Sequence, residues 1–116
     1  MQTPARISFG DVAIPGAIAE HFRWKDRNDN FHDVTNMETR HLFYTLRMIW
    51  NHRMPAEARF QQFKRYSFGN FYSPQYMLSA VYHIGRELAN RDNLTERQEK
   101  ELAFMAGYFS TKLSSL

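Results

Sequence analysis

The stretch of sequence that decides the fold runs from Thr35 to Pro55 and reads TNMETRHLFYTLRMIWNHRMP. Thr35 and Glu38 have the spacing of a capping box, which predicts a helix from residue 36 to residue 53. Pro55 ends that helix, because proline lacks the N–H that a helix interior requires. Five apolar side chains recur at helical spacing and predict its buried face: Leu42, Phe43, Leu46, Ile49 and Trp50.

Two further helices are expected in the second half of the chain. Ser73 and Pro74 fit the N-cap and first position of a helix that reaches residue 90. Thr95 and Gln98 form a second capping-box pattern, which predicts another helix beginning after Thr95. The expected buried side chains are Met77, Ala80, Val81, Ile84 and Leu88 on the first of these helices, and Leu102, Met105, Phe109 and Leu113 on the second.

The first 35 residues show no helical period and are punctuated by proline and glycine. Phe22 and Trp24, ahead of the polar run 26–30, fit either a short hairpin or an extended arm. We favour an apolar arm, which must dock on its own helices or on a neighbouring subunit. The sequence therefore predicts an all-α protein, with an extended N-terminal arm or short hairpin at residues 1–35 and a small bundle of three main helices at residues 36–116.

Composition excludes several kinds of chemistry. The absence of cysteine removes disulfides, thiolate metal sites and cysteine nucleophiles. The five histidines show no metal-ligand spacing, and no nucleophile or paired carboxylates have the context of an active site. We therefore expect no enzyme activity, no cofactor and no metal. No apolar run approaches the roughly 20 residues that cross a bilayer, and the start lacks a signal-peptide pattern, so the expected location is cytoplasmic, with no membrane partner.

Positive charge and aromatic rings are both concentrated in the middle of the chain. Residues 36–72 contain six lysines and arginines against two acidic residues. Such a local field favours anionic partners, although a face that merely keeps the protein soluble accounts for it equally well. Aromatic residues make up 16% of the chain, more than a small core needs. Their number predicts a binding surface or a subunit interface, and we expect a homo-oligomer.

The first candidate site is a stripe on the helix that follows Thr35. Its members, at spacings of i, i+4, i+7 and i+11, lie opposite Leu46 and therefore off the core face. Two guanidinium groups with a phenol between them can grip a phosphate and stack on a base. An exposed polar stripe, or an arginine paired with a glutamate of a neighbouring element, is the alternative. The stripe consists of Arg40, Tyr44, Arg47 and Asn51.

The second candidate site is the aromatic loop between residues 65 and 72. Cations alternate with rings there, a combination that suits stacking with phosphate neutralisation. The same rings could instead pin the loop onto the helices. The candidate ligand contacts in this loop are Arg65, Tyr66, Phe68 and Phe71.

Two glycines lie inside predicted helices, at Gly85 and Gly107. Each costs about 1 kcal/mol relative to alanine, so a physical reason for it is expected. Close approach of the second and third helices would supply that reason. We therefore predict a tight crossing of these helices at the two glycines.

Two segments carry a resemblance to known proteins: residues 38–52, ETRHLFYTLRMIWNH, and residues 66–77, YSFGNFYSPQYM. They resemble segments of small accessory proteins of tailed bacteriophages, a family without assigned catalytic residues. The resemblance covers residues 38–94 and leaves out the N-terminal arm. It implies a phage accessory protein that acts in the host bacterial cytoplasm. Small phage accessory proteins often counter host defence, either by binding a defence complex or by sequestering a nucleotide immune signal between subunits.

Three functions fit these observations. The one we favour is non-catalytic capture of a nucleotide-like anion in a pocket of arginines and rings that an oligomer encloses. The second is inhibition of a host defence protein through the arm or the aromatic loop. The third is nucleic-acid binding, which the charge permits without any recognition-helix pattern.

Overall fold

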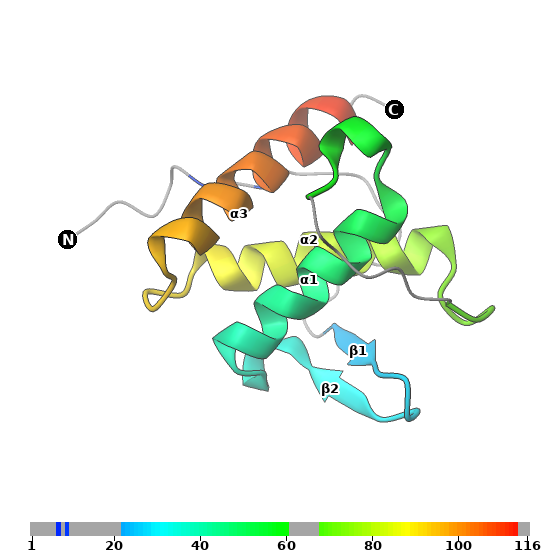
Figure 1. The fold of residues 1–116 in the computed structure, drawn as a ribbon. Coiled ribbons are helices and arrows are strands. Elements are labelled where there is room, and N and C mark those ends of the chain that lie inside the picture. Colours follow the sequence, from blue (N-terminus) through cyan, green and yellow to red (C-terminus); the bar gives the residue numbers. More distant parts are fainter. Residues whose placement is uncertain (1–6, 8, 10–21, 61–67, 114–116) are drawn as a thin grey trace.

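The computed structural model describes Ile7, Phe9 and residues 22–60 and 68–113. This part of the chain contains three α-helices and one two-stranded sheet (Figure 1). In chain order the elements are β1 (Arg23–Lys25), β2 (Phe31–Asp33), α1 (Thr39–Arg53), α2 (Pro74–Ala89) and α3 (Glu96–Tyr108). Short 3-10 turns cover Val34–Asn36 and Ala56–Ala58, and a π-helical turn, Phe109–Leu113, follows α3.

The expectation of an all-α protein is wrong, because residues 23–33 form an antiparallel hairpin and the fold is mixed α/β. The side chains of the turn explain the hairpin. Asp29 adopts a φ of 67°, a left-handed conformation that aspartate tolerates better than most residues. Oδ1 of Asp26 accepts hydrogen bonds from the backbone N–H groups of Asn28 and Asn30, at 2.8 and 2.9 Å. The polar run between Trp24 and Phe31 is therefore a structured turn. The flanking strands have three residues each, which is too few for hydrophobic alternation to distinguish a hairpin from an extended arm.

The start of α1 also differs from the prediction. α1 begins at Thr39, and its N-cap, Glu38, makes no side-chain capping bond. Thr35 instead lies in a 3-10 turn, where its N–H donates to Oδ1 of Asp33 at 3.0 Å. The predicted capping box is therefore wrong, because Thr35 is itself held by the aspartate that precedes it. The predicted end at Arg53 is confirmed.

The other two helix starts are confirmed. Ser73 accepts a hydrogen bond from the N–H of Tyr76, and Pro74 is the first residue of α2. Thr95 and Gln98 exchange both bonds of a capping box at the start of α3. These caps depend on residues three positions apart, so the sequence alone is enough to predict them.

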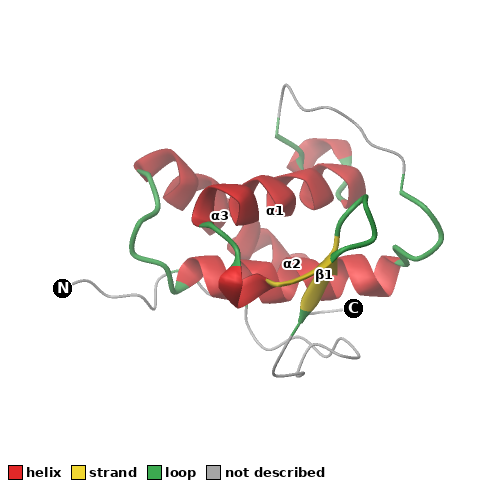
Figure 2. Cartoon of the chain, turned by 90° about the horizontal axis from the view of Figure 1, so that it is seen from below, coloured by secondary structure: helices red, strands yellow, loops and turns green. Residues whose placement is uncertain are grey.

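The core is built around α2. In Figure 2, α1 and α3 lie in one layer and α2 in a second layer. Phe22 stacks on His83 with ring centroids 5.0 Å apart, and Trp24 stacks on Tyr76 at 5.7 Å, so the hairpin also packs on α2. All the apolar residues predicted to be buried in α1 and α2 are buried, as are Leu102, Met105 and Phe109. The side chain of Leu113 lies outside the described part.

No helix in the described residues is long and apolar enough to cross a membrane.

The two helical glycines have different surroundings. A methyl group on Gly85 would clash with the ring of Phe9, which is 1% exposed and contacts Phe109 at 5.7 Å. No atom lies within 4 Å of the corresponding position on Gly107. The predicted tight crossing of helices at these glycines is therefore wrong. Gly85 makes room for an aromatic ring from the N-terminal segment, which at Phe9 docks on its own chain.

Candidate functional site

The stripe predicted on α1 divides into two halves. Arg40 and Tyr44 face solvent, and the Tyr44 side chain is 54% exposed. His41, next to Arg40, is exposed as well, and its ring lies 6.4 Å from that of His32 in β2. We call Arg40, His41 and Tyr44 the α1 face. A planar cation and a ring one helical turn apart can contact a phosphate and a base together.

Arg47 and Asn51 make contacts within the chain. Nε of Arg47 lies 3.6 Å from Oε1 of Glu101 in α3, and its guanidinium lies 5.4 Å from the centre of the Phe60 ring. The Asn51 side chain is 1% exposed, and its Oδ1 accepts a hydrogen bond of 2.7 Å from the N–H of Phe60. Arg47 and Asn51 therefore tie α1 to α3 and to the segment that follows α1. A ligand-binding role for the whole stripe stays a prediction.

The residues predicted in the aromatic loop are only partly described. Arg65 and Tyr66 lie outside the described residues. Phe68 is half-buried and its ring contacts those of His52, at 4.6 Å, and Tyr72, at 5.2 Å. Phe71 is 45% exposed. Phe68 thus pins the loop to α1, as the packing alternative proposed, whereas Phe71 presents its ring to solvent.

Phe71 belongs to a cluster that the sequence did not indicate. The ring of Phe31, which is 53% exposed, lies edge-on to it at 6.0 Å. Nζ of Lys25 lies 4.4 Å from the centre of the Phe71 ring, within the range of a cation–π contact. We call Lys25, Phe31 and Phe71 the hairpin patch. The strand register could have indicated two of its three members, because Lys25 and Phe31 are directly opposite each other in the hairpin.

Two tyrosines beneath the hairpin patch close the outer edge of β1. The hydroxyl of Tyr76 donates to the carbonyl of Arg23 at 2.7 Å and accepts from the N–H of Lys25 at 3.0 Å. The hydroxyl of Tyr72 donates to the carbonyl of Lys25 at 2.7 Å. Burial raises the pKa of Tyr76 to about 12 and raises the pKa of Tyr72 as well. The loop and α2 are therefore fixed to the hairpin by phenols that stay protonated.

The hairpin turn holds its own carboxylate. Nε2 of His32 lies 2.7 Å from Oδ2 of Asp26. That hydrogen bond, followed by the one from the N–H of Asn30, lowers the pKa of the Asp26 carboxyl to about 2. The Asp26 carboxylate is thus hydrogen-bonded within the turn, where it also accepts from the N–H of Asn28.

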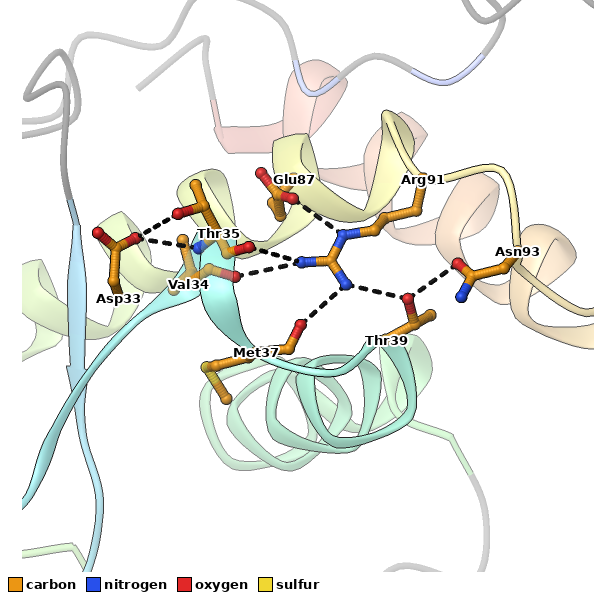
Figure 3. A network of polar contacts seen from close by, with 8 residues as sticks. All are labelled: Asp33, Val34, Thr35, Met37, Thr39, Glu87, Arg91 and Asn93. Carbon is orange, nitrogen blue, oxygen red and sulfur yellow. Dashed lines mark hydrogen bonds and ion pairs between the residues drawn. The ribbon is translucent and has the colours of Figure 1, made fainter.

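Arg91, after the end of α2, is engaged at all three nitrogens of its guanidinium (Figure 3). Its Nε donates to Glu87 at 2.9 Å, and one terminal nitrogen donates to the Met37 carbonyl and the Thr39 hydroxyl, at 2.9 and 3.0 Å. The other terminal nitrogen lies 3.4 Å from the carbonyls of Val34 and Thr35. With every nitrogen occupied, this arginine joins the start of α1 to the end of α2 and has a structural role.

No group of three or more metal-ligating side chains comes together within the described ranges.

Comparison with protein-family models, curated proteins and solved structures finds no match for this chain.

Proposed function

We propose that the protein is a non-catalytic binding protein that captures a phosphate-bearing, nucleotide-type ligand on the α1 face. The observation that carries the proposal is the composition of α1. Its fifteen residues include three arginines and two histidines and no acidic residue, and Arg40 lies in its first turn. The exposed side of α1 therefore offers positive charge, and the nearest carboxylate in sequence is that of the N-cap, Glu38, which is exposed two residues before Arg40.

Arg40 stands where a helix least favours a cation. The first turn of a helix carries a partial positive charge, which favours acidic side chains and disfavours basic ones. Arg40 is exposed and has no ion pair among the described residues. Intramolecular stability therefore gives no reason for an arginine here. A bound anion supplies one, because it would neutralise the guanidinium and interact favourably with the helix end.

Tyr44 supplies the second contact. Its ring lies one turn after Arg40 on the same side of α1 and is 54% exposed. Stacking of a base on an aromatic ring contributes about 1–3 kcal/mol, a useful share of the binding energy of a nucleotide. Because Arg47 and Asn51 are engaged elsewhere, the α1 face is smaller than the predicted stripe. A second copy of the chain would be needed to enclose the ligand, in keeping with the expected homo-oligomer.

The biological setting belongs to the same proposal. The resemblance of residues 38–52 and 66–77 to phage accessory proteins supports a protein that acts in the host bacterial cytoplasm. Removing a nucleotide immune signal from the host would then counter its defence. This role needs affinity and abundance, and it needs no catalytic group.

Thermal unfolding in the presence of cyclic di- and oligonucleotides and of ADP-ribose derivatives tests the proposal. A ligand at one hundred times its Kd stabilises the folded state by about 2.7 kcal/mol, so a true ligand should raise Tm clearly. We expect Arg40→Gln and Tyr44→Ala each to weaken binding at least tenfold. Arg53→Gln is the matched control, because Arg53 is exposed on the same helix, thirteen residues further on and on a different side.

Three outcomes would count against the proposal. One is that no compound in the panel raises Tm. Another is that Arg53→Gln weakens binding as much as Arg40→Gln, which would indicate attraction to net charge alone. The third is salt-sensitive binding to any DNA sequence with a larger effect than for nucleotides, which would favour nucleic-acid binding.

A further inference from the structure

We infer that His41 is a third ligand contact of the α1 face and that it makes the capture of a phosphate-bearing ligand stronger below neutral pH, an inference that rests on the proposed function. Histidine is the residue type whose charge ordinarily changes between pH 5 and pH 8. A histidine beside a bound phosphate therefore gains a charge-assisted hydrogen bond as the pH falls.

His41 lies beside both residues already assigned to the ligand. It follows Arg40 directly, and Tyr44 is four residues after Arg40 and three after His41, so on the helix surface Tyr44 is a neighbour of both. The His41 side chain is exposed, and within the described ranges it has no hydrogen bond and no ion pair. A ligand whose base stacks on Tyr44 can therefore place a phosphate within reach of the imidazole as well as the guanidinium.

His32 is the second histidine at this place, and its charge is compensated within the hairpin. Its ring is edge-on to that of His41, with the two centroids 6.4 Å apart. Nε2 of His32 lies 2.7 Å from Oδ2 of Asp26, and this bond lowers the pKa of the Asp26 carboxyl to about 2. A proton on His32 is therefore paired with the Asp26 charge and adds little net charge for a ligand.

The other charged groups near His41 are on its own helix and in β2. Arg40 and the exposed N-cap, Glu38, lie one and three residues before it. Asp33, next to His32 in β2, is hydrogen-bonded within the 3-10 turn that follows. Carboxylate and guanidinium groups ordinarily keep their charges between pH 5 and pH 8. The change in charge at the α1 face over this range therefore comes from histidine, and no carboxylate of the described residues is hydrogen-bonded to the His41 ring.

The choice of ligand isolates the contribution of the protein. Phosphate monoesters have a second pKa of about 6, so their own charge changes in the same range as that of histidine. Cyclic di-AMP and ADP-ribose lack this second acidic proton, because both ends of their phosphate groups are esterified. A change in their affinity between pH 5.5 and pH 7.5 therefore comes from the protein.

The test is isothermal titration calorimetry of the full-length protein with cyclic di-AMP and with ADP-ribose, at pH 5.5, 6.5 and 7.5 and constant ionic strength. We expect the Kd of the wild type to fall roughly three- to tenfold from pH 7.5 to pH 5.5, as one neutral contact becomes charged. His41→Asn should show the weaker binding at every pH, and His41→Lys, which keeps a positive charge, should show the tighter binding at every pH. His32→Asn is the matched control and should keep the pH dependence of the wild type.

Failure of the inference and failure of the proposed function give different results. A wild type that binds neither ligand at any pH counts against the proposed function and overturns the inference with it. Binding that does not change with pH, or that changes equally in the wild type and His41→Asn, overturns the inference alone and leaves the proposed function standing. The same holds for a pH dependence that His32→Asn abolishes.

A proton NMR titration of the unmodified protein is the second measurement, and it does not depend on how a variant folds. An anion that binds better to protonated His41 must in turn favour its protonation, because the coupling between two binding events is reciprocal. Saturating cyclic di-AMP or ADP-ribose should therefore move the titration of the His41 imidazole signals to higher pH. A His41 titration that the bound ligand leaves in place would overturn the inference.

Discussion

Arg40 is the residue whose position conflicts most with the helix that carries it. An arginine in the first turn faces the positive end of the helix dipole, and the exposed side chain has no ion pair among the described residues to compensate. Under the proposed function, the unfavourable interaction of Arg40 with the helix dipole is offset when its guanidinium binds an anion. Stability and binding should then respond in opposite directions to the same substitution.

We predict that Arg40→Glu raises the free energy of unfolding by about 0.3–1 kcal/mol, because it replaces an unfavourable charge at the helix start with a favourable one. Urea denaturation followed by circular dichroism measures this change. Arg53→Glu is the control of opposite sign, since Arg53 lies in the last turn of α1, where a cation is favourable. A loss of stability in Arg40→Glu would show that Arg40 is structural and would weaken its assignment to a ligand.

The two helical glycines, Gly85 and Gly107, have different surroundings and should therefore respond differently to replacement by alanine. Gly85 lies against the Phe9 ring, which cannot easily move because it is buried beside Phe109. We predict that Gly85→Ala lowers the free energy of unfolding by about 1–3 kcal/mol through overpacking. Gly107→Ala should raise it by up to about 1 kcal/mol, since alanine favours the helix and the added methyl meets no atom.

Thermal and urea unfolding of Gly85→Ala and Gly107→Ala measures both changes in the free energy of unfolding. Phe9→Leu should recover part of the loss in Gly85→Ala, because a smaller side chain leaves space for the methyl group. If Gly85→Ala is neutral on its own, Phe9 does not fill that position in solution.

At the scale of the elements, the hairpin depends on α2 for the outer edge of β1. The register and the flanking bonds leave the N–H of Lys25 and the carbonyl of Arg23 pointing away from β2. The single hydroxyl of Tyr76 satisfies both. An isolated two-stranded hairpin is marginal in water, so this contact gives the short strands a reason to persist. It also seals an edge that could otherwise pair with another chain.

We predict that Tyr76→Phe destabilises the fold by about 1–3 kcal/mol at neutral pH, because it leaves those two backbone groups without a partner. The phenol also makes stability depend on pH. The folded state raises the pKa of Tyr76 from 10.0 to about 12 by burial, so its contribution is complete below pH 10 and is lost as the pH rises towards 12.

Denaturation midpoints between pH 8 and 12 test this dependence, with the ultraviolet absorbance of tyrosinate recorded alongside. The wild type should lose more stability than Tyr76→Phe over this range, and it should show one more late-titrating tyrosine than the variant, in which Tyr72 remains. Tyr108→Phe is the control, because no hydrogen bond to the Tyr108 hydroxyl is present among the described residues. Identical pH profiles for all three proteins would contradict the bridging role of Tyr76.

At the scale of the whole molecule, Arg91 joins the segment that precedes α1 to the end of α2. It binds the backbone carbonyls that precede α1 from a position just after α2, across 54 residues in the case of Met37 (Figure 3). Those carbonyls belong to the 3-10 turn Val34–Asn36 and to Met37 after it, and among the described residues only that of Val34 has a further backbone donor, the N–H of Met37 at 3.3 Å. The planar fork of an arginine reaches several of them at once, which a lysine cannot do.

We predict that Arg91→Ala lowers the free energy of unfolding by about 2–4 kcal/mol, because several partly buried acceptors lose their donor together. Arg91→Lys should recover less than half of that loss. Arg97→Ala is the control and should change stability by less than about 0.5 kcal/mol, since Arg97 is exposed and makes a surface ion pair with Glu101. A small effect of Arg91→Ala in urea denaturation would show that the hairpin–α1 junction holds without it.

The sequence by itself determined the three helices and their buried faces. The sequence signals are the pair Ser73 and Pro74, the pair Thr95 and Gln98, and the apolar stripe from Leu42 to Trp50. Their members are one to eight residues apart, so local rules are enough to find them. Half of the predicted stripe, Arg40 and Tyr44, faces solvent as expected from helical geometry. The hairpin was misjudged because its strands are short and its turn depends on the side chain of Asp26.

Only the tertiary structure decided which arginines and aromatic rings stay exposed, where a partner could contact them. Arg47 and Asn51 are engaged by Glu101 and Phe60, Gly85 accommodates Phe9, and Phe71 meets Phe31 and Lys25. Apart from the Asn51 bond to Phe60, these contacts join residues separated by roughly 40 positions or more, and no pattern within one helix or loop contains both partners. Local spacing therefore placed the side chains on their helices, and long-range packing determined which of them could still bind something else.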